Sequence, residues 1–569
     1  MNKNTYDKPY KHLTTTLFVI TLLSIFSLAH NSGSIQINQK AATALGTDAL
    51  IFLPIILNNS ELGAPIDTPL AETGKGVTVV IFDRGLDWQH PDFINPDGTT
   101  RIKWILDMTG QNWCTANQVA PVEYSEAQIN AALQGQFNLP HRDAVGHGTA
   151  TAGAAAGNGR SLPNGRFAGV APDADLIIVK NTSEGAPAHG SYPAEAAFNG
   201  CMDEALDWAD AKITELGQPA VGIWNAGTQW GPMDGTSALS RKIEEVFGPN
   251  RPGRIWVASS GDEGSLPNHS GGNFNASSPG MVRLDHESNG TTFLTAWYSG
   301  EALARISIKL PNGNIVGPVG PGFSTNQNGV TIVQYVPGNE FYPWTSTGGD
   351  RAVWMSITGH EGIITFIIES IGNSVGRFDL YGDILGEEFL TPSSDFLDLL
   401  VPGRLNDVSA TVGAVVVGVH VERDSYTDID GIVRNFSHEG VTGDLWLKSS
   451  GGPTRDGRFV LDVTALGQNS FASLSQHSYW STIRGALPMA GEGYYVRFGG
   501  TSGAGPIVVG TIALMLEANP DLTAAEVKQI LRETAVSDQF TGETPNPNWG
   551  YGKLDITAAV QAARDSTNR

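Results

Sequence analysis

A serine lies between a glycine-rich turn and an apolar helical segment near the C-terminal end of the chain. The stretch reads FGGTSGAGPIVVGTIALML (498–516), and Ser502 stands at the expected start of the helix. A serine there is often only a helix cap. The position also suits a nucleophile, because the first backbone N–H groups and the helix dipole stabilise negative charge on an attacked carbonyl oxygen. Such a role further requires a base and an acid that orients the base.

Two earlier segments contain those residue types. His147 lies between two glycines in DAVGHGTATAGAAAGNG (143–159), at the start of a helix rich in small residues. Asp83 ends a buried β-branched run in VIFDRGLDWQHPDF (80–93), at the edge of a sheet where ligands gather in open α/β folds. Each residue alone is weak support for a catalytic role, because a histidine is more often structural and Asp-x-Gly is also an ordinary turn. The chain order of the three types, Asp, His, Ser, is the order of subtilisin.

The chain resembles the subtilase family of serine peptidases. The resemblance covers roughly 71–280 and 400–565, and it rests on VIFDRGLDWQHPDF, GHGTATAG, GTSGAGP, FAGVAPDADLIIVKN (167–181), SSGGPTRDGRFVLDVTALG (449–467) and WGYGKLDITAAV (549–560). It implies that Asp83 orients His147, that His147 is the general base and acid, and that Ser502 is the nucleophile that forms an acyl-enzyme. It also implies a three-layer α/β core with a mainly parallel sheet.

One residue departs from the family pattern at the expected oxyanion site. Relatives usually carry Asn in the segment that matches VASSGDEG (257–264), where its amide donates a hydrogen bond, but this chain has Asp262. An ionised carboxylate cannot donate, and losing one such donor typically costs ~10²–10³ in rate. Three interpretations stay open: a protonated Asp262 that donates at acidic pH, slow turnover with the Ser502 N–H alone, or an impaired homologue kept as a binding or scaffold protein. Because the triad is complete, we expect activity.

Further departures concern the neighbours of the triad. Arg84 replaces the small residue that usually follows the catalytic Asp, and the stretch between the predicted signal peptide and residue 70 is shorter than the usual prodomain. The resemblance places the walls of the primary substrate pocket at Gly227, Thr228 and Gly261. The small residues there predict an open slot for a substrate side chain.

A parallel α/β sheet must position these side chains. Continuous β-branched runs recur at 75–85, 174–181, 219–227 and 254–261, and helical patterns such as 192–216 lie between them. Strands that alternate with helices are typical of a parallel sheet with helices on both faces. We therefore predict an α/β fold.

The alternation of strands and helices stops near residue 280. From there to 385 the chain has short alternating strands with Gly, Asn and Pro turns, the pattern of an antiparallel β-sandwich of jelly-roll type. The α/β pattern then resumes. We predict a signal peptide (1–29), a propeptide or linker (30–70), a catalytic core in two parts (71–279 and 401–565) and an inserted β-sandwich (280–400).

The N-terminal segment and the charge predict an exported protein. Basic residues precede LFVITLLSIFSLA (17–29), an apolar run too short to span a bilayer that ends in small residues, as expected for cleavage near Ala29. An uncleaved anchor is the alternative. The formal charge of −23 argues against nucleic-acid binding, which needs a basic surface. We expect a secreted or periplasmic monomer that acts on proteins or peptides and is not membrane-bound after cleavage.

Cysteines and acidic residues leave two structural questions open. Cys114 and Cys201, the only cysteines, could form one disulfide or remain separate thiols. The implied chemistry requires no cofactor, but structural calcium is common in the family. The candidate ligands are in DSYTDIDG, with Asp424, Asp428 and Asp430, and in NPDG (95–98), where turn chemistry is an equally good explanation.

Overall fold

The computed structural model describes residues 70–109, 121–163, 165–182, 201–286, 291–337, 341–383 and 394–567. All of them belong to one compact unit that spans 51–569. The predicted signal peptide, residues 30–69 of the predicted propeptide or linker (30–70), and Cys114 lie outside the described residues. Cys201 is buried and disulfide-bonded.

The centre of the fold is an eight-stranded sheet with the order β21-β18-β6-β5-β1-β4-β2-β3. The strands pair in parallel except β3, which is antiparallel to β2. The predicted α/β fold is therefore confirmed. The strand bounds are β1 Thr78–Asp83, β2 Ile102–Asp107, β3 Val122–Ser125, β4 Asp175–Lys180, β5 Ala220–Trp224, β6 Arg254–Ser259, β18 Val415–Val421 and β21 Leu461–Gln468.

Strand β1 shows why these apolar runs form a buried sheet. Val79 and Ile81 pack into the core on one face of the sheet, and Val80 and Phe82 pack into the core on the other. All four side chains are fully buried. Since both faces are covered, a continuous β-branched run is the expected sequence of such a strand.

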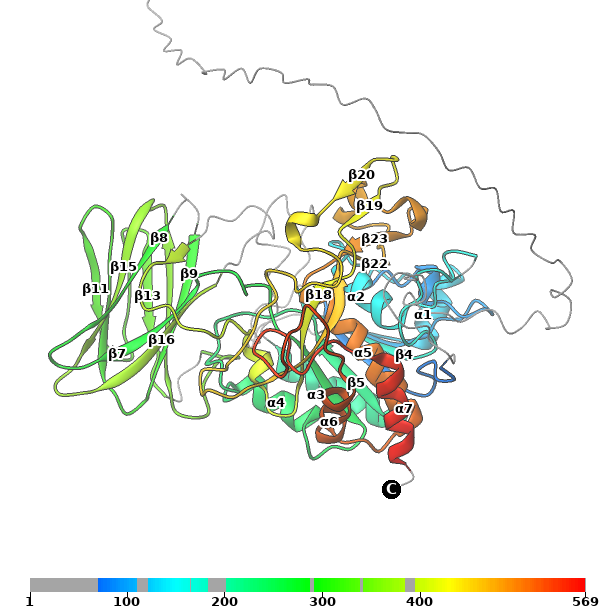
Figure 1. Ribbon diagram of the computed structural model, residues 1–569, viewed down its shortest axis with the longest axis horizontal. Helices are drawn as coiled ribbons and strands as arrows, with labels where there is room; N and C mark the ends of the chain where they lie inside the picture. Colours follow the sequence, from blue (N-terminus) through cyan, green and yellow to red (C-terminus); the bar gives the residue numbers. More distant parts are fainter. Residues whose placement is uncertain are drawn as a thin grey trace, which may run out of the picture. The chain divides into compact units, whose positions relative to one another are not determined.

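Helices cover both faces of this sheet (Figure 1). The core of Val79 and Ile81 is shared with α1 (Glu126–Leu133), α2 (His147–Ala156), α5 (Thr501–Ala518), α6 (Ala524–Thr534) and α7 (Ile556–Ser566). The opposite core is shared with α3 (Met202–Leu216) and α4 (Ala238–Phe247). Among the described residues, α5 alone is long and apolar enough to cross a membrane, and here it is the largely buried central helix of the core.

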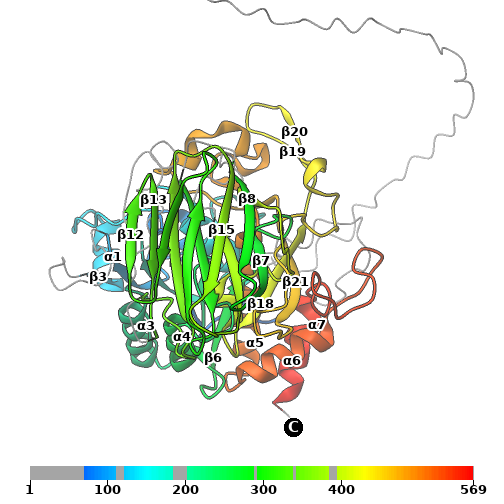
Figure 2. The same cartoon turned by 90° about the vertical axis from the view of Figure 1, so that its left-hand side faces the viewer.

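The inserted domain is a sandwich of two antiparallel sheets, as predicted (Figures 1 and 2). Their inner faces enclose a third core, which includes Leu294, Phe366 and Phe378. The first strand starts at His269, inside the range that the sequence suggested for the catalytic core. One sheet contains β8 Gly280–His286, β10 Ala304–Lys309, β11 Ile315–Val319, β15 Gly362–Ser370 and β17 Ser394–Phe396; the other contains β7 His269–Phe274, β9 Thr291–Tyr298, β12 Ser324–Gln327, β13 Val330–Gln334, β14 Arg351–Thr358 and β16 Gly376–Asp383.

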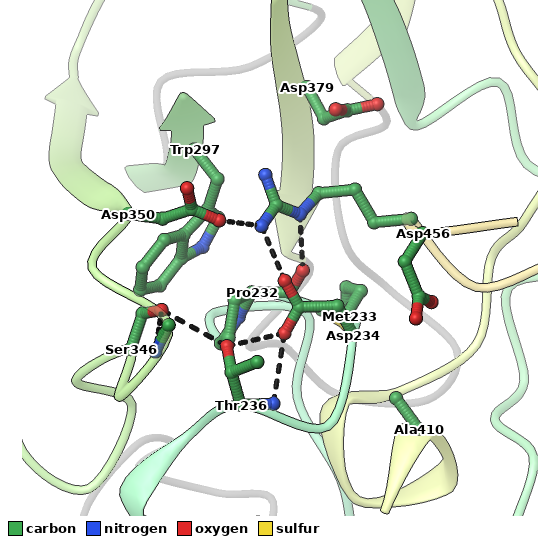
Figure 3. Close-up of polar contacts among 12 residues, drawn as sticks. Pro232, Met233, Asp234, Thr236, Trp297, Ser346, Asp350, Asp379, Ala410 and Asp456 are labelled. Atoms are coloured by element: carbon green, nitrogen blue, oxygen red, sulfur yellow. Dashed lines mark hydrogen bonds and ion pairs between the residues drawn. The ribbon is translucent and has the colours of Figure 1, made fainter. Parts of the chain in front are cut away.

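A largely but not fully buried arginine joins the sandwich to the α/β core. Figure 3 shows the carboxylates of Asp234, from the core, and Asp350, from the sandwich, directed at one guanidinium, that of Arg455. Close by, Trp297 of the sandwich donates its indole N–H to the carbonyl of Trp230 at 3.0 Å. Trp297 also belongs to the core that α3 and α4 cover. The sandwich is thus attached by apolar packing and by an ion-pair cluster.

Short hairpins and 3-10 helices complete the described part of the chain. Two hairpins pair β19 Ser425–Thr427 with β20 Val433–Asn435 and β22 Ser470–Ser473 with β23 Tyr495–Phe498. The 3-10 helices are η2 Pro91–Phe93, η3 Asp407–Ala410, η4 Ser437–Glu439, η5 Tyr479–Thr482, η6 Arg484–Ala486 and η7 Met489–Gly491.

Candidate active site

Asp83 is the last residue of β1 and lies at the carboxyl edge of the parallel sheet. Its side chain is buried and accepts hydrogen bonds from the backbone N–H of Arg84 at 2.7 Å and from the hydroxyl of Thr151 at 2.9 Å. Parallel strands direct their carboxyl ends to one edge, which is where sites form in such sheets. These hydrogen bonds fix the position of the carboxylate.

His147 is the first residue of α2, and its ring contacts Asp83 directly. Its Nδ1 lies 2.9 Å from both carboxylate oxygens of Asp83. This contact orients the imidazole and leaves Nε2 as the atom that can exchange a proton with a substrate group. Two aromatic rings lie next to it at steep interplanar angles, with centroid distances of 5.3 Å to Phe498 and 5.9 Å to Trp480.

A buried carboxylate fixes the start of helix α2. Asp143 accepts hydrogen bonds from the backbone N–H groups of Gly146 and Thr149 and from the Thr149 hydroxyl. Burial and the nearby charge of Asp83 raise the pKa of Asp143. Gly146 itself has φ 111°, a left-handed conformation that glycine adopts without strain. Sequence reasoning missed Asp143, although an Asp just before a helix is a recognisable capping pattern.

Ser502 is the second residue of α5, and a hydrogen-bonded chain links it to Asp83. The side-chain amide of Asn225 donates to the carbonyl of Ser502 and to the hydroxyl of Thr151, both at 2.8 Å. Thr151 in turn donates to Asp83. In the part of the chain that the structure describes, the Ser502 hydroxyl itself makes no hydrogen bond. Catalytic hydrogen bonds are often formed only in the substrate complex.

Thr151 and Asn225 were not singled out from the sequence, although both carry usable patterns. Thr151 follows His147 by one helical turn, and residues four apart share a helix face. Asn225 directly follows the buried strand β5, at the same sheet edge as Asp83. The structure therefore brings Asp83 and His147 into contact and connects the Ser502 segment to them through these two side chains.

The turn before Ser502 is held by a glutamine from the end of β21. Gln468 is buried, and its side-chain oxygen accepts the backbone N–H of Gly500 at 2.6 Å. Its amide donates to the carboxylate of Glu439 in η4, also at 2.6 Å. Gln468 lies 32 residues from Gly500, so no local sequence pattern could have revealed this contact.

Asp262 lies at the start of α5, and both of its described hydrogen bonds use it as an acceptor. Its Oδ1 receives the backbone N–H of Thr501 at 2.9 Å and the Thr501 hydroxyl at 2.8 Å. A side chain on Gly500 would lie 2.5 Å from the other oxygen, Oδ2. The carboxylate thus satisfies an N–H group of the first helical turn, and a negative charge there is favourable. The role as a hydrogen-bond donor to an oxyanion stays a prediction.

The glycines that were predicted to border the substrate pocket make room for neighbouring side chains. A Cβ on Gly227 would lie 2.3 Å from the amide nitrogen of Asn406, and one on Gly261 would lie 2.6 Å from a carboxylate oxygen of Glu263. The carbonyl of Thr228 accepts the backbone N–H of Asp407 at 3.0 Å. These positions are therefore closely packed on at least one side, and the open slot stays a prediction.

The two candidate calcium segments use their carboxylates in other ways. Asp428 receives the Nε of Arg434 at 2.7 Å, Asp430 receives the Nε of Arg484 at 2.8 Å, and Asp97 receives a turn N–H at 3.0 Å. The carboxylate of Asp424 accepts a hydrogen bond from the hydroxyl of Ser425 at 3.1 Å. Within the described ranges, no group of three or more His, Cys, Asp or Glu side chains could hold a metal ion. The structure does not support these segments as calcium ligands.

We compared the chain with models of known protein families. The model of the Subtilase family matches residues 74–552. The chain belongs to the subtilase family. This confirms the resemblance inferred from the six sequence motifs.

Individual relatives match over different shares of the chain. The minor extracellular protease Vpr of Bacillus subtilis is 24% identical over 520 residues, which are 88% of this chain and 53% of Vpr. The serine protease AprX of the same organism is 38% identical over 112 residues, which are 20% of this chain and 24% of AprX. This subtilase thus spans about half or less of the length of these curated relatives.

A solved structure supports the fold. The CspB protease of Clostridium perfringens aligns with a TM-score of 0.66 at 22% identity, and the alignment covers 87% of this chain and 94% of the CspB chain. At that identity the likeness establishes the subtilisin-like fold of this subtilase. Its activity has to be argued from the site.

Proposed function

We propose that the chain is a secreted serine endopeptidase that cleaves peptide bonds through an acyl-enzyme on Ser502. The observation that carries the proposal is the contact of His147 Nδ1 with both carboxylate oxygens of Asp83 at 2.9 Å. This arrangement holds the ring with Nε2 available to a hydroxyl. The Asn225–Thr151 chain ties the Ser502 segment to the same carboxylate.

In the proposed reaction, Ser502, His147 and Asp83 each have one defined role in acylation and in deacylation. Ser502 Oγ attacks the carbonyl carbon while His147 Nε2 takes its proton, and Asp83 stabilises the imidazolium. The imidazolium then protonates the leaving amine, so that the C–N bond breaks and the acyl-enzyme remains. His147 next removes a proton from water, and the resulting hydroxide attacks the ester carbonyl. The imidazolium then returns its proton to Ser502 Oγ as the ester C–O bond breaks, which releases the carboxylic acid and the free Ser502.

The oxyanion would be held at the start of α5. The backbone N–H of Ser502 belongs to the first helical turn, where N–H groups lack intrahelical acceptors. Asp262 stands where a second donor is usual and would donate only when protonated. We therefore propose a peptidase whose rate at neutral pH is limited by this residue.

Protein or peptide substrates and an extracellular place of action complete the proposal. The family supports protein or peptide substrates. The apolar segment 17–29 and the relative Vpr, which is named as an extracellular protease, support the place of action. We further propose that the chain works as a monomer and that a primary pocket is bordered by Gly227, Thr228 and Gly261.

A serine-directed fluorophosphonate probe tests the proposed nucleophile. The probe should label the wild-type chain between pH 4 and pH 9, and Ser502→Ala should abolish the label. Ser277→Ala, at an exposed serine in a turn of the sandwich, is the matched control and should be labelled like the wild type. Absence of labelling at every pH, or labelling that persists in Ser502→Ala, would contradict the proposal.

A second candidate function is binding without catalysis. The acceptor role of Asp262 toward Thr501 favours it, because a carboxylate opposes the negative charge that develops on the substrate. Such a protein would bind unfolded peptides next to Ser502 yet leave both probe and peptides intact. The labelling experiment therefore separates the two candidates.

A further inference from the structure

The segment between β22 and β23 lies against the loop that carries the catalytic histidine. The hydroxyl of Ser475 donates to the carbonyl of Asp143 at 2.9 Å, and the backbone N–H of Tyr479 donates to the carbonyl of Ala144 at 2.8 Å. The N–H of Trp480 donates to the carbonyl of Val145 at 3.4 Å. These bonds fix residues 475–480 immediately beside His147.

Trp480 meets the catalytic ring from this segment. Its ring centroid lies 5.9 Å from that of His147 and 6.0 Å from that of Phe498. A side chain on Gly146 would come within 3.1 Å of the Trp480 ring, so the glycine permits this close approach. Phe498 is buried, whereas Trp480 is partly exposed. Trp480 therefore offers aromatic surface to solvent next to the imidazole.

The chemistry of the reaction defines which part of a substrate comes to this surface. In the proposed mechanism, Nε2 of His147 must reach the nitrogen of the leaving amine. The residue that carries this nitrogen is the one immediately after the scissile bond. Its side chain must then lie close to whatever flanks the imidazole, because it is only one atom removed from the protonated nitrogen. Asp83 occupies the Nδ1 side of the ring.

We infer that Trp480, supported by Phe498, forms the wall of a subsite for the residue immediately after the scissile bond, and that this subsite takes a large apolar or aromatic side chain. The inference rests on the proposed function. Partly exposed tryptophan provides a large apolar surface that stacks on aromatic and aliphatic groups. Substrates with glycine or a small polar residue at this position leave that surface unused.

The test compares selectivity ratios instead of single rates. One pair of internally quenched peptides differs only after the scissile bond, with Phe or Gly; a second pair differs only before the bond. We expect the wild type to prefer Phe in the first pair by about tenfold or more in kcat/KM. Trp480→Ala should bring this ratio close to one and leave the ratio of the second pair unchanged. Trp480→Phe should keep most of the preference.

A control variant and a labelling check separate the ways in which the inference could fail. Ile483→Ala, in the same loop and 37% exposed, should preserve both ratios. A loss of rate that is equal for Phe and Gly would mean that Trp480 only supports His147, and it would overturn the inference, as would a wild-type ratio near one. Failure of the fluorophosphonate to label Ser502 would instead overturn the proposed function, and the inference with it.

Discussion

Asp262 caps the helix that carries the proposed nucleophile: its carboxylate accepts the backbone N–H of Thr501 at 2.9 Å, one residue before Ser502. The residue that departs from the family pattern thus has a structural role of its own. Oδ1 is used by Thr501, while Oδ2 lies next to Gly500. An asparagine could keep the first contact and place its amide nitrogen where Oδ2 lies.

Replacing the Asp262 carboxylate with the amide of an asparagine tests whether this position is a hydrogen-bond donor to the oxyanion. We expect Asp262→Asn to raise kcat at neutral pH by about 10²-fold, because a donor replaces a charge that opposes the oxyanion. The activity profile should also extend from acidic toward neutral pH. Peptide hydrolysis measured from pH 4 to pH 9 gives both quantities. Glu263→Gln, which alters the neighbouring carboxylate, is the control, and an unchanged pH profile in Asp262→Asn would contradict the prediction.

Asp83→Asn should nearly abolish turnover while the fold persists. An asparagine can present N–H to His147 Nδ1 and so favour the wrong tautomer, a change that costs about 10⁴ in kcat in comparable triads. Steady-state kinetics and the thermal unfolding midpoint together measure the effect. Asp97→Asn, at an exposed turn, should leave kcat unaltered. A loss of less than about tenfold in Asp83→Asn would mean that another group orients the histidine.

The contact between Gln468 and Gly500 should matter for the rate more than for stability. Gln468→Ala removes the acceptor of the Gly500 N–H, so the turn before Ser502 loses a fixed hydrogen bond. Small displacements of a nucleophile cost up to about 10² in rate, and we expect kcat to fall by ten- to a hundredfold. Gln476→Ala, at an exposed glutamine, is the control. Equal kcat in both variants would rule out this positioning role.

Arg455 should be essential for holding the sandwich on the core. Arg455→Met leaves Asp234 and Asp350 close together without their shared cation. Removing one partner of a buried ion pair costs about 3–5 kcal/mol, which is the upper limit for this partly exposed cluster. Urea unfolding should report this loss, and the added change Asp350→Asn should recover part of it. Arg241→Met removes an exposed pair and should cost less than about 1 kcal/mol. Similar losses in the two single variants would contradict the prediction.

Asp407 should make the protein less stable as the pH rises toward neutrality. Burial, reinforced by Asp234 and opposed by Arg455, raises the pKa of Asp407 to about 7, above the value of about 3.9 for an exposed Asp. The folded chain therefore binds the extra proton between these pH values. Its stabilising contribution is complete below about pH 4 and is lost as the pH rises through about 7, at a cost of up to about 4 kcal/mol.

Asp407→Asn isolates this effect. The variant cannot ionise, so its free energy of unfolding should change less between pH 4 and pH 8 than that of the wild type. Denaturant unfolding at several pH values measures the difference. Asp424→Asn, with a partly exposed side chain at the edge of a hairpin, is the control and should keep the wild-type slope. A wild-type slope in Asp407→Asn would contradict the assignment.

The fold and the helix starts of the site could be predicted from the sequence because they depend on local patterns. The β-branched run that ends at Asp83 predicts a buried strand. Glycine on both sides of His147 indicates a tight turn at the start of a helix. The small residues around Ser502 mark the same kind of turn. Each of these patterns depends on neighbours within a few positions, which a single sequence contains.

Contacts between distant segments could not be predicted in this way. Gln468 reaches Gly500, and Asn225 reaches Ser502, across parts of the chain that only the folded sheet brings together. The acidic residues around Asp428 are a calcium candidate in the sequence, with turn chemistry as an equally good explanation, because their spacing does not indicate the contact with Arg434. The first strand of the sandwich at 269–274 is rich in Ser, Gly and Asn, so it lacks the apolar alternation that marked the later strands.

The most direct test of the central claim is the digestion of a denatured protein, with the products identified by mass spectrometry. The account predicts new peptides with the wild-type chain and none with Ser502→Ala or His147→Ala at equal concentration. New peptides that persist in the Ser502→Ala digest, or none in any digest from pH 4 to pH 9, would contradict it.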